Sequence, residues 1–212
     1  MKRVGDLQVL ALLALAKLAF HLATSQGYGI FRDEYYYLAC SDRLAWGYVD
    51  HPPLSIALLW VVRRTLGDSL PAIRFLVGVA GAASVFVAGL IARELGGRRG
   101  AQVLTGLTVF FAPYYLAVSH FYSMNAFDVL CWTVLELLAV RILWRDEPRL
   151  WVWFGVVAGL GLQNKYSVAF FAIGLLAGLL LTPQRLHLSS GWQMHVGALA
   201  ASRVAPHVGG GA

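Results

Sequence analysis

Charged residues are scarce in this sequence. Asp, Glu, Lys and Arg make up 13% of its 212 residues, whereas hydrophobic residues make up 58%. A soluble domain of this length has too little core to bury so much apolar surface, so the composition indicates an integral membrane protein. The net charge of +6 does not indicate nucleic-acid binding, because the arginines cluster at the ends of the hydrophobic segments. The expected environment is therefore a lipid bilayer.

Cysteine is nearly absent as well. Cys40 falls in a loop and Cys131 in an apolar segment, and neither belongs to a Cys-x-x-Cys or His-Cys grouping. The sequence therefore predicts no disulfide framework and no cysteine-based metal site. It also lacks the internal repeat that is typical of secondary transporters.

Six apolar segments predict an all-α, polytopic membrane bundle. A membrane-spanning helix needs about 20 apolar residues, and only the fifth segment is clearly short. Between the first two segments lies a loop, residues 27–70, in which amphipathic patterns over 33–44 and 54–66 predict short interfacial helices. The six predicted spans are residues 7–26, 72–92, 101–119, 126–144, 150–164 and 167–182.

Basic residues predict the orientation. If the spans alternate, most lysines and arginines of the short loops fall on one side, whereas the turn 119–125 has none and the turn near 163–166 has only Lys165. By the positive-inside rule the N-terminus is cytoplasmic and loop 27–70 faces outward. The loop, the turn before Asp128 and residues 164–166 are then expected to meet at the outer face.

Titratable residues gather in these same places. Residues 31–37 read Phe-Arg-Asp-Glu-Tyr-Tyr-Tyr, and residues 47–54 read Gly-Tyr-Val-Asp-His-Pro-Pro-Leu. Asp128 stands at the head of the fourth span, and residues 159–167 include Asn-Lys-Tyr. Charge this close to a bilayer is costly unless it binds a charged ligand, performs chemistry or stays hydrated.

Together these motifs resemble those of bacterial GT-C glycosyltransferases. The closest likeness is to the family-39 group that includes protein O-mannosyltransferases and lipid A aminoarabinose transferases. It covers a membrane module of residues 1–185. Because family members usually continue through several more membrane spans, the chain resembles a truncated or frameshifted enzyme that keeps the catalytic amino-terminal half. Residues 186–212 are expected to form an atypical, disordered tail.

The resemblance implies a membrane glycosyltransferase of the bacterial cytoplasmic membrane. Such an enzyme moves a sugar from a polyprenyl-phosphate donor to a glycan, lipid or protein acceptor on the outer face, by a single inverting displacement. Asp33 is the candidate general base that takes the acceptor proton. Glu34 and Asp128 are the further candidate catalytic carboxylates.

Substrate contacts are expected from a second set of residues. Lys165 and His51 can compensate the charge that grows on the departing phosphate. Tyr36 and Tyr166 are additional candidate substrate-binding residues. A divalent metal ion held by Asp50 and His51 is an alternative source of positive charge.

Plainer interpretations remain open. Asp33 and Glu34 can simply cap a helix, and Lys165 can extend to the membrane interface. The tyrosines can form an interfacial aromatic belt. At the level of the whole chain, the alternatives are a non-catalytic lipid-binding membrane protein and, less favoured, a transporter.

Overall fold

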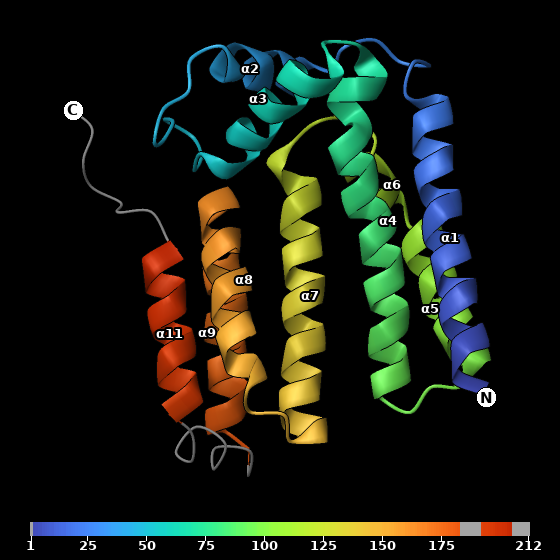
Figure 1. Ribbon diagram of the computed structural model, residues 1–212, viewed down its shortest axis with the longest axis vertical. Coiled ribbons are helices and arrows are strands. Elements are labelled where there is room, and N and C mark those ends of the chain that lie inside the picture. Colours follow the sequence, from blue (N-terminus) through green and yellow to red (C-terminus); the bar gives the residue numbers. More distant parts are fainter. Residues whose placement is uncertain (1, 183–191, 205–212) are drawn as a thin grey trace.

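The computed structural model describes residues 2–182 and 192–204 of the chain, and every regular element in these ranges is an α-helix (Figure 1). The predicted all-α class is therefore confirmed. The helices are α1 (Lys2–Thr24), α2 (Arg32–Ser41), α3 (Leu54–Leu66), α4 (Leu70–Glu94), α5 (Arg99–Phe111), α6 (Pro113–Val118), α7 (Met124–Arg145), α8 (Leu150–Asn164), α9 (Val168–Leu180) and α11 (Trp192–Val204).

The long helices run side by side, and α2 and α3 lie across one end of the bundle (Figure 1). Helix α1 packs on α4 and α5, α4 packs on α7, and α7 packs on α8. Helices α2 and α3 occur where the amphipathic patterns over 33–44 and 54–66 predict them. They form a platform at the end opposite the start of α1.

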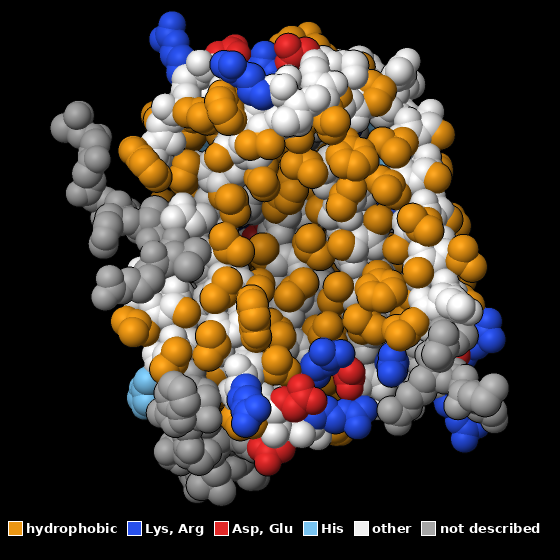
Figure 2. Space-filling model, viewed as in Figure 1, with side chains coloured by type: hydrophobic (Ala, Val, Ile, Leu, Met, Phe, Trp, Pro, Cys, Tyr) orange, Lys and Arg blue, Asp and Glu red, His pale blue; other side chains and the backbone are white. Residues whose placement is uncertain are grey.

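Within residues 2–182 and 192–204, two helices are long and apolar enough to cross a membrane: Asp6–Thr24, with 19 residues, and Leu70–Glu94, with 25 residues. Helices α8 and α9 are apolar but have only 15 and 13 residues. Figure 2 shows hydrophobic side chains across the middle of the visible face, with charged side chains gathered at both ends. This distribution is the one that a hydrocarbon layer between two aqueous phases favours.

The predicted span 101–119 is two helices. Helix α5 ends at Phe111, and α6 begins at Pro113 after an extended Ala112 (φ −59°, ψ 128°). Proline has no amide hydrogen and disfavours helical geometry in the residue before it. The prediction of one continuous helix is therefore wrong at this point.

Part of the predicted disordered tail is helical. Helix α11 packs against α8, and a Cβ atom on Gly155 would overlap the backbone of Gly197. Only glycine permits backbones to approach so closely. The expectation of disorder over 186–212 is thus wrong for 192–204, while the rest of that segment lies outside the described residues.

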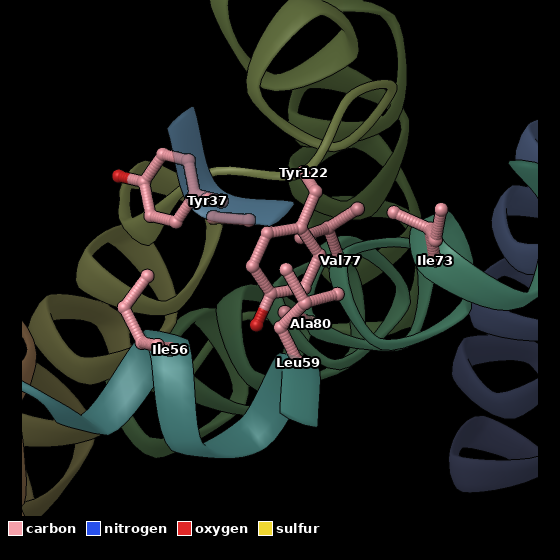
Figure 3. Close-up of a cluster of buried hydrophobic side chains, with 8 residues drawn as sticks. Tyr37, Ile56, Leu59, Ile73, Val77, Ala80 and Tyr122 are labelled. Atoms are coloured by element: carbon pink, nitrogen blue, oxygen red, sulfur yellow. The ribbon is translucent and has the colours of Figure 1, made fainter. Parts of the chain in front are cut away.

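A buried hydrophobic cluster joins the platform to the bundle (Figure 3). Its members come from α2, α3, α4, α7 and the segment before α7, and most are almost completely inaccessible to solvent. Apolar burial therefore fixes the height of α2 and α3 above the long helices. The cluster consists of Tyr37, Ile56, Leu59, Ile73, Val77, Ala80, Tyr122 and Ala126.

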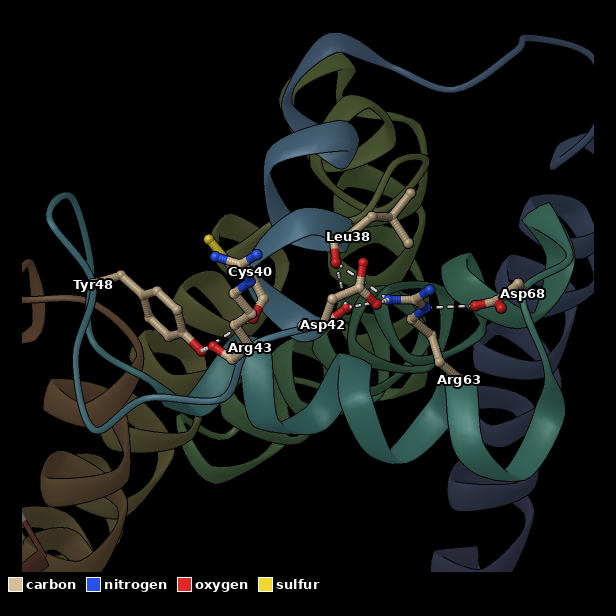
Figure 4. A network of polar contacts seen from close by, with 8 residues as sticks. Leu38, Cys40, Asp42, Arg43, Tyr48, Arg63 and Asp68 are labelled. Carbon is tan, nitrogen blue, oxygen red and sulfur yellow. Dashed lines mark hydrogen bonds and ion pairs between the residues drawn. The ribbon is translucent and has the colours of Figure 1, made fainter.

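A polar network binds α3 to α2 (Figure 4). The Nη1 atom of Arg63 donates to the Leu38 carbonyl (3.2 Å), Ser41 Oγ (2.7 Å) and Asp42 Oδ1 (2.6 Å), and its Nε donates to Asp68 Oδ1 (2.5 Å). The hydrogen bonds to Asp68 and Asp42 hold the pKa of Arg63 above its ordinary value. The two platform helices are consequently one unit.

Candidate functional site

Glu34 is completely buried, and four donors occupy its carboxylate. Arg74 donates through Nε to Oε1 (2.9 Å) and through Nη2 to Oε2 (2.6 Å). The backbone N–H of Tyr122 donates to Oε1 (2.7 Å), and that of Phe31 donates to Oε2 (2.8 Å). Burial raises the pKa of Glu34, but these donors outweigh burial and hold it below its ordinary value. A carboxylate satisfied in this way is suited to fixing α2 in place.

Arg74 is the partner that the sequence analysis missed. It lies in the first turns of α4, and only 3% of its surface is exposed. Beyond Glu34 it donates to the carbonyls of Ser25 (2.5 Å), Tyr28 (3.1 Å) and Gly29 (2.7 Å). It therefore ties the end of α1 to the start of the platform. A single arginine inside an apolar span was the signal in the sequence.

Asp33 has the opposite environment to its neighbour. Its side chain is 46% exposed and forms an ion pair with Arg32 (3.1 Å), which is itself 89% exposed. Successive residues of a helix point about 100° apart, so one carboxylate of the pair enters the core and the other faces outward. Of the two, Asp33 is the one that a ligand can reach.

His51 lies in an aromatic group. Its ring stacks on Tyr37, with centroids 5.1 Å apart and planes 5° apart, and meets the Tyr36 ring edge-on at 5.5 Å. Its Nδ1 lies 3.1 Å from the Pro52 carbonyl oxygen, whereas its buried Nε2 has no partner among the residues described. His51 therefore keeps one nitrogen for a ligand or a water molecule.

Asp50 is exposed and lies near the phenol of Tyr36. Desolvation, together with the neighbouring Cys40 and Asp50, raises the pKa of Tyr36 to about 12, so that hydroxyl stays protonated at neutral pH. In residues 2–182 and 192–204, no group of three or more His, Cys, Asp or Glu side chains is placed to hold a metal ion. Asp50 and His51 alone offer fewer protein ligands than the three of a typical catalytic zinc site.

Asp128 and Lys165 are brought together at the start of α7. Asp128 is 7% exposed, accepts a hydrogen bond from Ser167 Oγ and has its Oδ2 3.6 Å from Lys165 Nζ. Lys165 Nζ also donates to Asn125 Oδ1 (2.9 Å), and a third of its side chain is exposed. An ammonium group has three hydrogens, so Lys165 keeps donor capacity for an anion. Tyr166 beside it is half exposed.

Tyr37 and Asn164 connect these groups. The Met124 N–H donates to the Tyr37 hydroxyl (3.1 Å), and the fully buried Asn164 donates from Nδ2 to the Met124 carbonyl (2.9 Å). Burial raises the pKa of Tyr37, and the nearby Asp33 carboxylate adds to this rise. The platform, the start of α7 and the end of α8 thus meet at one end of the bundle, as predicted. That this end is the outer face stays a prediction.

A cleft of about 330 Å³ opens beside Asp128 between α6, α7 and α9. A second, largely apolar cleft of about 490 Å³ shares three of its residues and continues along α7 to Trp144. Asp33, Asp50, His51 and Lys165 do not line either one, so Asp128 is the only one of these five candidates on the cleft wall. The first cleft is lined by Tyr114, Tyr115, Asp128, Val129, Trp132, Thr133, Glu136 and Phe171.

The family model of dolichyl-phosphate-mannose-protein mannosyltransferases matches residues 50–209 of the chain. The chain belongs to this family. Family membership supports a membrane glycosyltransferase of the GT-C type that uses a lipid-linked sugar donor. The matched region includes His51, Asp128 and Lys165, and it runs well beyond residue 185, where the sequence resemblance was expected to end. No curated protein and no solved structure matches the chain.

Proposed function

We propose that this member of the mannosyltransferase family carries out an inverting sugar transfer from a polyprenyl-phosphate donor at the platform end of the bundle. The observation that supports it most is the Lys165 ammonium, held by Asn125 and by Asp128, which lines the cleft between α6, α7 and α9. The ammonium would neutralise the donor phosphate. The two adjoining clefts together follow α7 from Asp128 to Trp144, about 24 Å at 1.5 Å per residue, and the apolar one would accept part of the lipid tail.

Asp33 would act as the general base. It would take the proton from an acceptor hydroxyl while the acceptor oxygen attacks the anomeric carbon and the bond from that carbon to the phosphate oxygen breaks. Polyprenyl phosphate would leave with the bonding electrons, and Lys165 would stabilise the charge on its oxygen. We assign Glu34 a positioning role, because its oxygens are occupied by four donors.

The platform end would face outward from a bacterial cytoplasmic membrane, with the N-terminus of α1 on the cytoplasmic side. Arg93, Arg141 and Arg145 lie toward the other end of the bundle, where the last two form ion pairs with Glu94 at 3.0 Å. This charge distribution follows the positive-inside rule. The acceptor would be a hydroxyl of a glycan, lipid or protein.

The test is transfer of radiolabelled mannose from dolichyl-phosphate-mannose by the purified chain in lipid nanodiscs. Asp33→Asn should lower turnover by about 10²–10⁴-fold, the loss that is typical of an acid–base group, while donor binding stays normal. Lys165→Ala should weaken donor binding as well as turnover, and Lys165→Arg should retain most of the binding because it retains the charge.

Near-normal transfer by Asp33→Asn would remove Asp33 from the mechanism. Donor binding without transfer by the unmodified chain would instead favour the non-catalytic, lipid-binding alternative. An exposed carboxylate far from the platform, Asp146→Asn, supplies the matched control and should leave transfer unchanged.

A further inference from the structure

The break between α5 and α6 is bound by a lysine from another helix. Because α5 ends at Phe111, carbonyl groups of its last turn lack intrahelical partners. Lys17 Nζ donates to one of these, the Phe110 carbonyl, at 2.7 Å. The same nitrogen lies 5.2 Å from the centroid of the Phe110 ring, a cation–π distance.

Lys17 is an unusual residue at this depth. It has no solvent exposure, and it lies seven residues before the end of α1, about 10 Å into a helix that is apolar enough to cross a membrane. Among the ion pairs of the described residues, none includes Lys17. Such residues within a membrane are rare and are usually functional.

The broken helix carries two cleft residues. Tyr114 and Tyr115 belong to α6 and line the cleft beside Asp128. A continuous helix through residue 112 would have a different course, because the extended Ala112 is what redirects the chain. The position of the two tyrosines therefore depends on the break.

The far end of α6 has contacts of its own. Ser119 packs on α4 so closely that a Cβ atom on Gly81 would lie 2.7 Å from Ser119 Cβ. Three residues later the Tyr122 N–H donates to Glu34. Lys17 thus binds the end of α5 just before α6 begins, and its Cε would lie 3.7 Å from the same Gly81 Cβ, so it is close to the Ser119 contact as well.

We propose that Lys17 is a positioning residue of the active site. By binding the Phe110 carbonyl it fixes the geometry of the break between α5 and α6. This geometry in turn places Tyr114 and Tyr115 against the substrate in the cleft. The inference rests on the proposed function where it concerns catalysis. Its geometric part, that Lys17 sets the place of α6, is independent of any activity.

Two substitutions separate positioning from plain stabilisation. Lys17→Met removes the charge and keeps the linear side chain, which leaves the Phe110 carbonyl unpaired. Pro113→Ala restores an amide hydrogen, so that α5 can continue and pair its own carbonyls. Leu12→Met on the exposed face of α1 is the matched control and should change nothing.

Lys17→Met should lower the thermal unfolding temperature and reduce mannose transfer at least tenfold, with a raised KM for the donor. The double variant Lys17→Met with Pro113→Ala should recover the unfolding temperature without recovering transfer. Recovery of both would show that Lys17 only stabilises the fold, and an unchanged Lys17→Met protein would show that the carbonyl contact has no role.

Cross-linking tests the geometry without activity. After replacement of Cys40 and Cys131 by serine, the pair Tyr115→Cys and Thr133→Cys places one thiol on α6 and one on α7, both at the cleft. A short bifunctional maleimide, added below the unfolding temperature of Lys17→Met, should join them when Lys17 is present and should fail in Lys17→Met. Equal cross-linking in both backgrounds would overturn the inference, even if the chain transfers no sugar.

Discussion

Glu34→Gln is expected to be one of the most destabilising conservative changes in this protein. The glutamine side chain has the same shape, but one of its two oxygens is replaced by an NH₂ group. Each Glu34 oxygen accepts two hydrogen bonds, one from Arg74 and one from a backbone N–H. Whichever way the amide is turned, its NH₂ group faces two donors, and both hydrogen bonds are lost.

The expected cost follows from these contacts. Two lost hydrogen bonds to a charged group, at about 1.5–3 kcal/mol each, amount to about 3–6 kcal/mol. Removal of one partner from a buried ion pair costs about 3–5 kcal/mol, which agrees with this sum. The Arg74 guanidinium would keep its hydrogen bonds to the carbonyl oxygens of Ser25, Tyr28 and Gly29, but it would lose the negative charge that balances it. We expect a loss of about 3–5 kcal/mol in the free energy of unfolding.

Reversible unfolding in mixed detergent micelles, followed by circular dichroism, measures this quantity. Asp33→Asn is the matched control, because it is the same chemical change one residue earlier on an exposed side chain. It should change the free energy of unfolding by less than about 0.5 kcal/mol. The double variant Glu34→Gln with Arg74→Met should cost less than the sum of the two single changes, because the buried charges are removed together. A loss below about 1 kcal/mol in Glu34→Gln would refute the assigned role.

Three further predictions concern pH, the platform and helix contacts. The pKa of Glu34 is lowered in the folded state, so the Glu34 carboxylate contributes fully to stability above the ordinary pKa of 4.5, and this contribution is lost as pH falls through the folded pKa. Unfolding measured over an acid titration should show this loss in the native chain and not in Glu34→Gln. Arg63→Lys should lower the free energy of unfolding by about 1–2 kcal/mol, because an ammonium group cannot serve all the acceptors that the guanidinium reaches. Gly155→Val should separate α11 from α8 at Gly197 and increase proteolysis there, whereas Gly174→Val, with open space around it, should behave like the native chain.

The composition and the motifs predicted much of the helical architecture. The length of each apolar segment and the period of each amphipathic pattern are local properties of the chain. They predict the all-helical class, the platform helices and the positions of α1, α4, α7 and α8. Alternation of the spans across the membrane predicted that the platform meets the turn 119–125 and the turn near 163–166. The break at Pro113 was also visible in the sequence, although it was not predicted.

Local sequence could not assign different environments to Asp33 and Glu34. They are neighbours with the same chemistry, and the difference arises because Arg74 and Tyr122, 40 and 88 positions away from Glu34, converge on one carboxylate and leave the other outside. The role of Lys17 has the same origin, since its carbonyl partner is 93 residues away. Hydrophobic length and period decide which segments become helices. Which polar side chains become partners depends on distances across the bundle, and these exist only once the helices have packed.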